Sequence, residues 1–316
     1  MSSGWNCSPS SFGPTGSLRV RPVLKHPQML YNKKPAMEAS RLGYPCNPMV
    51  NTDKSLPSVT EHSLPWTVQF SDCDLTHFMN IAANFGSETY AYAVTPNVDH
   101  LIRFCDDASF RELYRTAGFV LLDSRFLAYL LRLVAGLRLP TSPGSDVTAH
   151  LFDEVIMPDD KVVVIGGSAE QAEILSKRYG LKALRHLNPP MGFINDPAAV
   201  DECLRFVENE SPFRFCLLAV GCPQQEMLAK ALQSRGRARG LALCIGASIN
   251  FLTGGERRAP KWIQHAGLEW LYRLLNDPTR LARRYLIRGP RIFLLLPRLH
   301  FEQHPVAAFV SEKPRP

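Results

Sequence analysis

The stretch KVVVIGGSAEQAE, Lys161 to Glu173, joins a short apolar run to a glycine turn and then to a helix-length segment. A near-continuous run of Val and Ile is typical of a parallel β-strand that helices cover on both faces. Similar runs, separated by helix-length amphipathic segments, recur along the chain: YAYAV (90–94), FVLL (119–122), FCLLAVG (215–221) and LALCIG (241–246). This alternation predicts an α/β fold with a doubly wound, mostly parallel, Rossmann-like sheet.

Composition divides the 316 residues into three expected parts. Residues 1–65 hold nine of the 25 prolines, many serines and no sustained helical or alternating pattern, which indicates a mobile N-terminal arm. Residues 66–255 carry the apolar runs and form the expected α/β core. Residues 256–316 form an expected basic, amphipathic helical appendage.

The cysteines and the N-terminal sequence favour a cytosolic protein. The eight cysteines form no C-x-x-C pair, and Cys216 and Cys244 lie inside apolar runs. We therefore expect reduced core thiols rather than disulfides or a zinc site. The N-terminus lacks the pattern of a signal peptide, and no apolar segment has the length of a transmembrane helix.

The net charge of +7 lies entirely in the last part of the chain. From Glu256 onward there are twelve Lys and Arg against five Asp and Glu, so the rest of the chain is neutral. This asymmetry suggests an anionic partner, either nucleic acid or a phospholipid surface. Arg280, Arg284 and Arg288 recur at helical spacing, and the apolar segment RIFLLLPRL (291–299) that follows is too short to span a bilayer. From composition alone, membrane docking and a solvated basic face explain this segment equally well.

Polar or glycine-rich residues follow each apolar run, where parallel sheets bind their ligands. Taken singly, each group is more simply explained as a helix cap or a tight turn. Together, the five strand ends could meet in one crevice. The groups are Thr95-Pro96-Asn97, Asp123-Ser124, Gly166-Gly167-Ser168, GCPQQE (221–226) and Gly246-Ala247-Ser248.

Gly166 and Gly167 form the best nucleotide-binding candidate, because a glycine turn before a helix presents backbone N–H groups to a diphosphate. The turn lacks both G-x-G-x-x-G and the P-loop pattern, which disfavours NAD and NTP sites and still allows a sugar nucleotide. Asp72 and Asp74 form a D-x-D pair that could bind a metal, but we prefer Asp74 as a helix cap. We expect neither a metal nor a cofactor.

Asp123 has two possible roles. It stands between an apolar run and the amphipathic segment RFLAYLL (125–131), where it could cap the next helix. A carboxylate held at the edge of a sheet could equally accept a proton as a general base. The two roles are compatible, since a capping residue is held rigidly by the backbone.

The order of several motifs resembles the WecG/TagA/CpsF family, glycosyltransferase family 26, from Trp66 to Tyr285. The family resemblance implies a bacterial enzyme that moves a hexose from a UDP-sugar to a polyprenyl-diphosphate-linked saccharide. It further implies inversion at the sugar, no metal requirement, and work at the inner face of the cytoplasmic membrane in exopolysaccharide or cell-surface glycan synthesis. The matching motifs include VTPNVDH (94–100), LLDS (121–124), PGSDVT (143–148), VGCPQQE (220–226) and CIGASINFLTG (244–254).

The resemblance also assigns roles to residues. It implies that Asp123 is the general base, with Thr95 and Asn97 lining the pocket and orienting substrate. It implies substrate contacts from Gly166, Gly167, Gln225, Glu226 and Asp146, and arginines that bind the lipid diphosphate or the leaving group: Arg273, Arg280 and Arg283. Two positions depart from the family pattern, Ser124 where glycine is usual and Asn250 where many relatives carry Asp.

The expected partners are a UDP-hexose, the lipid-linked acceptor and an anionic membrane surface; a homo-oligomer is possible, and no nucleic acid is expected. Two other functions stay open. A dinucleotide-dependent oxidoreductase on a similar sheet is disfavoured by the missing glycine fingerprint. A basic nucleic-acid-binding protein is disfavoured by the poor interleaving of aromatic residues with the arginines.

Overall fold

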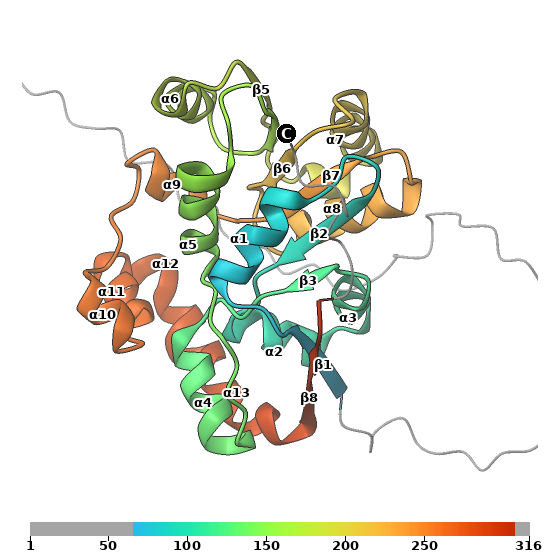
Figure 1. Cartoon of the computed structure of the whole chain (residues 1–316). Helices are drawn as coiled ribbons and strands as arrows, with labels where there is room; N and C mark the ends of the chain where they lie inside the picture. Colours follow the sequence, from blue (N-terminus) through green and yellow to red (C-terminus); the bar gives the residue numbers. More distant parts are fainter. Residues whose placement is uncertain (1–65, 307–316) are drawn as a thin grey trace, which may run out of the picture. The chain divides into compact units, whose positions relative to one another are not determined.

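The computed structural model describes residues 66–306, which contain a six-stranded sheet in the order β3-β2-β7-β6-β4-β5 (Figure 1). Every neighbouring pair of strands in it is parallel, which confirms the predicted α/β class. The expected N-terminal arm lies outside the described residues. The strands are β2 (Tyr90–Val94), β3 (Phe119–Val120), β4 (Lys161–Ile165), β5 (Ala183–Leu187), β6 (Phe215–Leu218) and β7 (Gly240–Cys244).

Helices connect the strands and cover both faces of the sheet. On β4, Val163 and Ile165 belong to one buried cluster and Val162 and Val164 to the other, because successive side chains of a strand point to opposite faces. One cluster contains residues of α2 (Val98–Asp106), α3 (Ala108–Arg115), α4 (Arg125–Ala135), α7 (Pro197–Asn209) and α8 (Gln224–Arg235). The other contains residues of α1 (Leu75–Asn84), α5 (Gly144–His150), α6 (Ala169–Tyr179) and α9 (Ser248–Leu252).

The structure differs from the predicted strands in two places. In the run at 119–122, strand β3 comprises only Phe119 and Val120, although the backbone N–H of Leu121 also donates to Val94 of β2 at 2.9 Å. Strand β5 was not predicted, because its sequence ALRHL is not apolar; it forms the edge of the sheet, where none of its side chains is fully buried.

The C-terminal part is mostly helical, as predicted, but ends in a strand. It contains α10 (Lys261–His265), α11 (Glu269–Asn276), α12 (Pro278–Ala282), the π-helical segment η3 (Arg283–Arg288), α13 (Ile292–Leu295) and β8 (Leu299–His304). Strand β8 lies parallel to β1 (Trp66–Ser71) in a separate two-stranded sheet (Figure 1). Neither β1 nor β8 was predicted.

Apolar residues of this C-terminal part belong to the main core. Ile292, Leu296 and Leu299 are almost fully buried in the same cluster as α2 and α4. The segment from α13 to β8 is therefore packed against the α/β core. Within residues 66–306, no helix is both long enough and apolar enough to cross a bilayer.

Candidate functional site

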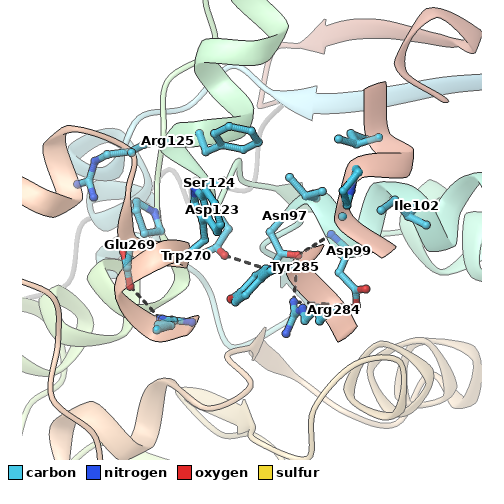
Figure 2. Close-up of a pocket in the computed structure, with 18 of the residues that line it drawn as sticks. Asn97, Asp99, Ile102, Asp123, Ser124, Arg125, Glu269, Trp270, Arg284 and Tyr285 are labelled. Atoms are coloured by element: carbon cyan, nitrogen blue, oxygen red, sulfur yellow. Dashed lines mark hydrogen bonds and ion pairs between the residues drawn. The ribbon is translucent and has the colours of Figure 1, made fainter. Parts of the chain in front are cut away.

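A pocket of about 450 Å³ lies between the carboxyl ends of β2 and β3 and the C-terminal helices. Polar groups from the strand ends and arginines from the C-terminal part line it, together with apolar and aromatic side chains (Figure 2). Its lining includes Asn97, Asp99, Asp123, Phe126, Trp270, Arg273, Arg284, Tyr285, Leu286, Ile292 and Phe293. The pocket therefore combines charged, polar and apolar surface.

Asp123 faces this pocket and does not cap α4. The cap is Ser124, whose Oγ accepts a hydrogen bond from the backbone N–H of Leu127 at 3.2 Å. The expectation that Asp123 could combine both roles is therefore corrected. Its carboxylate instead accepts from the backbone N–H of Gly144 at 2.6 Å and from Nδ2 of Asn97 at 3.3 Å. These two donors hold the carboxylate of Asp123 in one orientation.

Position 144 has little room for a side chain, because the side chains of Thr95 and Asp123 both approach it. A Cβ atom at this position would lie 2.9 Å from Oγ1 of Thr95 and 3.6 Å from Oδ1 of Asp123. The missing side chain lets the Gly144 N–H reach the carboxylate. Thr95 itself donates to the carbonyl oxygen of Cys244 at 3.5 Å and is not among the pocket-lining residues.

Asn97 begins α2 and connects the helix to Asp123. Its Oδ1 accepts from the backbone N–H of Asp99 at 3.1 Å, which caps the helix. Nδ1 of His100 lies 2.9 Å from the same oxygen. Because Oδ1 is occupied by these contacts, the amide presents Nδ2 to Asp123, as Figure 2 shows.

Two arginines of the C-terminal part line the pocket. Arg273, on α11, donates to Glu269 at 2.9 Å. Burial lowers the pKa of the Arg273 guanidinium, but Glu269 and Asp123 raise it more, so the pKa is above its ordinary value. Arg284, in η3, donates to Oδ1 of Asn97 at 3.4 Å (Figure 2). Both guanidinium groups are therefore charged and close to the strand ends.

The other two expected arginines lie elsewhere. Arg280 is exposed and donates to Asp277 at 2.6 Å, while Arg283 is exposed, and neither lines the pocket. Arg284 was not selected as a site residue from the sequence. Arg284 and Arg288 are four residues apart, which places them on one face of a helix. Both form ion pairs with Asp99, which lies two residues after Asn97.

Asp99 joins α2 to the C-terminal arginines. Its side chain is 12% exposed and forms ion pairs at 3.3 to 4.0 Å with three guanidinium groups, those of Arg103, Arg284 and Arg288. Burial raises the pKa of the carboxyl, but these arginines lower it more, and the result is below the ordinary value. Asp99 thus fixes Arg284 beside the pocket.

Gly166 and Gly167 form the expected turn after β4, but they do not line this pocket. Both have positive φ, and a Cβ at Gly166 would lie 2.9 Å from the backbone of Ala219. Close packing of two strand ends therefore explains Gly166 as well as a nucleotide would. Their role in binding the donor stays a prediction.

Gln225 and Glu226 are buried, with 5% and 0% of their surface exposed. Oε1 of Gln225 accepts from the backbone N–H of Gly246, and its Nε2 donates to Glu226, both at 2.8 Å. In this arrangement neither side chain can touch a ligand directly. The expected contact with the sugar donor therefore requires either that these side chains move or that they act through other residues.

Asp146 and Asn250 also have partners within the chain. Asp146 does not line the pocket; its carboxylate pairs with Arg258 at 2.6 Å and, at 3.3 Å, with Arg125, which does line it. Oδ1 of Asn250 accepts from Gln171 at 2.8 Å, which an aspartate could do equally well. Asp146 therefore forms ion pairs within the chain, and its contact with substrate stays a prediction.

One group of side chains in the described residues could hold a metal ion. His100, Cys222 and Glu226 each offer a ligand atom, and these atoms lie within 4.8 Å of one another. Burial and Glu226 raise the pKa of the Cys222 thiol well above its ordinary value. Asp74 caps α1 by accepting from the backbone N–H of His77 at 2.7 Å, which confirms its predicted role.

Comparison with known families agrees with the motif order. The family model described as "Glycosyl transferase WecG/TagA/CpsF family" matches residues 65–305, most of the chain, including all strands and the C-terminal helices. The match selects a transferase over an oxidoreductase and over a nucleic-acid-binding protein. A glycosyltransferase binds a sugar donor and an acceptor, and the pocket beside Asp123 offers a place where they could meet. The chain belongs to the WecG/TagA/CpsF family of glycosyltransferases.

Proposed function

We propose that this protein is an inverting hexosyltransferase that moves a hexose from a UDP-sugar to a polyprenyl-diphosphate-linked saccharide. It would serve bacterial exopolysaccharide or cell-surface glycan synthesis at the inner face of the cytoplasmic membrane. The observation that carries the proposal is the position of Asp123. Ser124 caps α4, so the carboxylate of Asp123 does not. It faces a pocket that Arg273 and Arg284 also line.

The proposed reaction needs one general base and a stabilised leaving group. The acceptor hydroxyl oxygen forms a bond to the anomeric carbon, and its proton passes to the Asp123 carboxylate. The bond from the anomeric carbon to the diphosphate oxygen breaks, and UDP leaves with the electron pair on the opposite face. Because the attacking and leaving oxygens lie on opposite faces, a single displacement inverts the configuration.

Arginines supply the charge that a diphosphate requires. A planar guanidinium can donate two parallel hydrogen bonds to phosphate oxygens. Arg273 and Arg284 are the two arginines that both line the pocket and belong to the C-terminal part. They support binding of the lipid diphosphate or the UDP leaving group without a metal ion. The apolar wall formed by Phe126, Trp270 and Phe293 suits the first units of a polyprenyl chain.

Exposed apolar side chains beside these arginines support a membrane-surface location. Leu286, Ile287, Phe293 and Leu294 are each more than half exposed, and Arg288 and Arg291 stand among them. Such a surface can insert its apolar side chains at the headgroup boundary while its arginines contact anionic lipid.

The direct test is transfer from a panel of UDP-sugars to a synthetic polyprenyl-diphosphate-linked saccharide, with mass detection of the lipid product. We expect one UDP-hexose to be used, unchanged turnover in EDTA, and an inverted anomeric configuration by NMR. Transfer only from a sugar carried on another nucleotide would refute the donor assignment. Loss of turnover in EDTA, restored by a divalent ion, would refute the metal-independent mechanism.

A further inference from the structure

We infer that His100 is a positioning residue, held by the buried Glu226, that fixes the amide of Asn97 toward Asp123. The inference rests on the proposed function only in taking Asp123 as the general base. None of the sequence motifs assigns a role to His100, although it lies within VTPNVDH (94–100).

A continuous line of polar contacts runs from the interior of the protein to the pocket. Glu226 on α8 approaches Nε2 of His100 on α2, with 3.7 Å between Oε1 and the ring nitrogen. Nδ1 of the same ring lies 2.9 Å from Oδ1 of Asn97. Nδ2 of Asn97 then donates to Oδ2 of Asp123 at 3.3 Å. The line crosses from one helix to another and ends on the carboxylate that faces the pocket.

Burial makes this line rigid. His100 is 8% exposed and Glu226 is fully buried. Glu226 is held at Oε1 by Gln225, which is itself fixed by the backbone of Gly246. Burial raises the pKa of Glu226, but the nearby His100 and the hydrogen bond from Gln225 lower it more, so the pKa lies below its ordinary value. The imidazole ring of His100 and the amide of Gln225 are polar side-chain groups that lie beside this carboxylate.

The contacts of Asn97 define the direction of its amide. Nδ1 of His100 also approaches the backbone nitrogen of Asn97, but at 3.3 Å, which is longer than the 2.9 Å to Oδ1. Because Oδ1 can only accept, the shorter contact requires Nδ1 to carry a hydrogen. The N–H groups of Asp99 and Arg284 point at Oδ1 as well. The donor end of the amide is therefore the end left for Asp123.

This arrangement gives buried Glu226 a function without contact with substrate. Packing against Glu226 helps to hold the His100 ring in place, and His100 orients the Asn97 amide. The amide hydrogen bond then holds the carboxylate of Asp123 in the conformation it needs to receive a proton. Small errors in such an orientation lower turnover by about 10- to 100-fold.

Three substitutions separate positioning from packing. In His100→Asn, the amide nitrogen occupies nearly the place of Nδ1, so contact with Asn97 is kept. In His100→Gln, the amide nitrogen is nearer to the place of Nε2, and in His100→Ala both contacts are lost. His150→Ala removes an exposed histidine and serves as the matched control.

We expect kcat of His100→Ala and His100→Gln to fall by about 10- to 100-fold with KM of the donor nearly unchanged. His100→Asn should stay within about threefold of the wild type on the same reasoning. Thermal melting of each variant establishes that it is folded at the assay temperature. Equal losses in His100→Asn and His100→Gln would overturn the inference, because loss of packing would then explain both.

A second readout does not depend on the reaction. The side-chain amide of Asn97, assigned in the NMR spectrum by its absence from Asn97→Asp, should be shifted downfield by its bond to Asp123. The shift should be lost in His100→Ala and kept in His100→Asn. An unchanged Asn97 resonance in His100→Ala overturns the inference whatever the activity. Failure of the proposed function is seen separately, as a wild-type protein that transfers no hexose from a UDP-sugar.

Discussion

Oδ1 of Asp99 lies 3.6 Å from Nη1 of Arg288, and this ion pair joins α2 to the C-terminal arginine segment. Arg284 lies 4.0 Å from the other carboxylate oxygen and also contacts Asn97. Asp99, two residues after the cap of α2, therefore anchors the segment that carries the pocket-lining Arg284. Asp99 and Arg284 line the same pocket as Asp123, so loss of the Asp99 carboxylate should affect stability and turnover together.

We expect Asp99→Asn to lower the free energy of unfolding by about 1 kcal/mol at pH 7, because it leaves three partly exposed guanidinium groups without their shared counter-charge. Because the folded-state pKa of Asp99 is below its ordinary value, the stabilisation is present above the pKa of the unfolded chain, about 3.9. It is lost as the pH falls through the lower, folded-state pKa. Urea unfolding at pH 7 and near pH 3 measures the difference. A deficit that is the same at both pH values would contradict this explanation.

Asp123→Asn should reduce transfer by at least about 100-fold while the protein stays folded. The amide has nearly the shape of the carboxylate but cannot accept the proton of the acceptor hydroxyl. Turnover and melting temperature are measured on the same preparation, with Ser124→Gly as a comparison that restores the residue usual in the family. Turnover near that of the wild type in Asp123→Asn would assign the base to another residue.

Gly144→Ala tests the close approach of the Gly144 backbone to the Asp123 carboxylate. The new Cβ would lie 2.9 Å from Oγ1 of Thr95, so either the threonine or the turn must move. We expect a loss of about 1–3 kcal/mol in stability from overpacking, and a lower kcat because the N–H bond to Asp123 is disturbed.

The matched control for this substitution is Gly255→Ala, where the nearest atom is 3.6 Å from the added Cβ. Its melting temperature and kcat should stay close to those of the wild type. A Gly144→Ala variant with the same values as Gly255→Ala would mean that the turn tolerates a side chain and that the approach is not required.

Much of the fold could be predicted from the sequence because parallel strands buried on both faces must be apolar. The runs that became β2, β4, β6 and β7 satisfy this rule. The edge strand β5 could not be found this way, since an exposed edge admits Arg and His. The β1–β8 pair joins residues more than 230 positions apart, and no local pattern identifies such a contact.

In the candidate site too, some residues could be predicted from the local sequence and others could not. Asp123 and Asn97 could be predicted because each follows an apolar run. The sequence could not decide whether Asp123 or Ser124 caps α4, because both side chains are good caps. The contacts of Arg284 with Asn97 and of His100 with Glu226 form between elements that only the tertiary fold brings together.

Arginine substitutions distinguish the two sets of candidate cations. We expect Arg273→Ala and Arg284→Ala each to lower kcat/KM for the lipid-linked acceptor by at least about tenfold, as for loss of a charge-assisted hydrogen bond. Arg280→Ala should have an effect within about threefold, since Arg280 is exposed and paired with Asp277. Steady-state kinetics with the acceptor varied provides the comparison. A loss in Arg280→Ala as large as that in Arg284→Ala would show that the C-terminal helices rearrange on substrate binding.

Membrane docking is best tested by point substitutions in the C-terminal part. Deleting everything after Gly255 would remove Ile292, Leu296 and Leu299 from the main core, so a truncated chain would lose stability for reasons unrelated to membranes. Replacing Ile287 and Leu294 with Ser removes two exposed side chains, which are 68% and 75% accessible, and leaves the core intact.

We expect the double substitution Ile287→Ser, Leu294→Ser to weaken co-sedimentation with anionic liposomes by at least about tenfold, since burying each side chain at the interface contributes about 1 kcal/mol or more. Added salt should weaken binding of the wild type further, because arginines contribute to it. Met157→Ser, at a residue 62% exposed after α5, is the control for a general change in surface polarity and should bind as the wild type does. If the double variant sediments with anionic liposomes as fully as Met157→Ser, the apolar residues of the C-terminal part are not the docking surface.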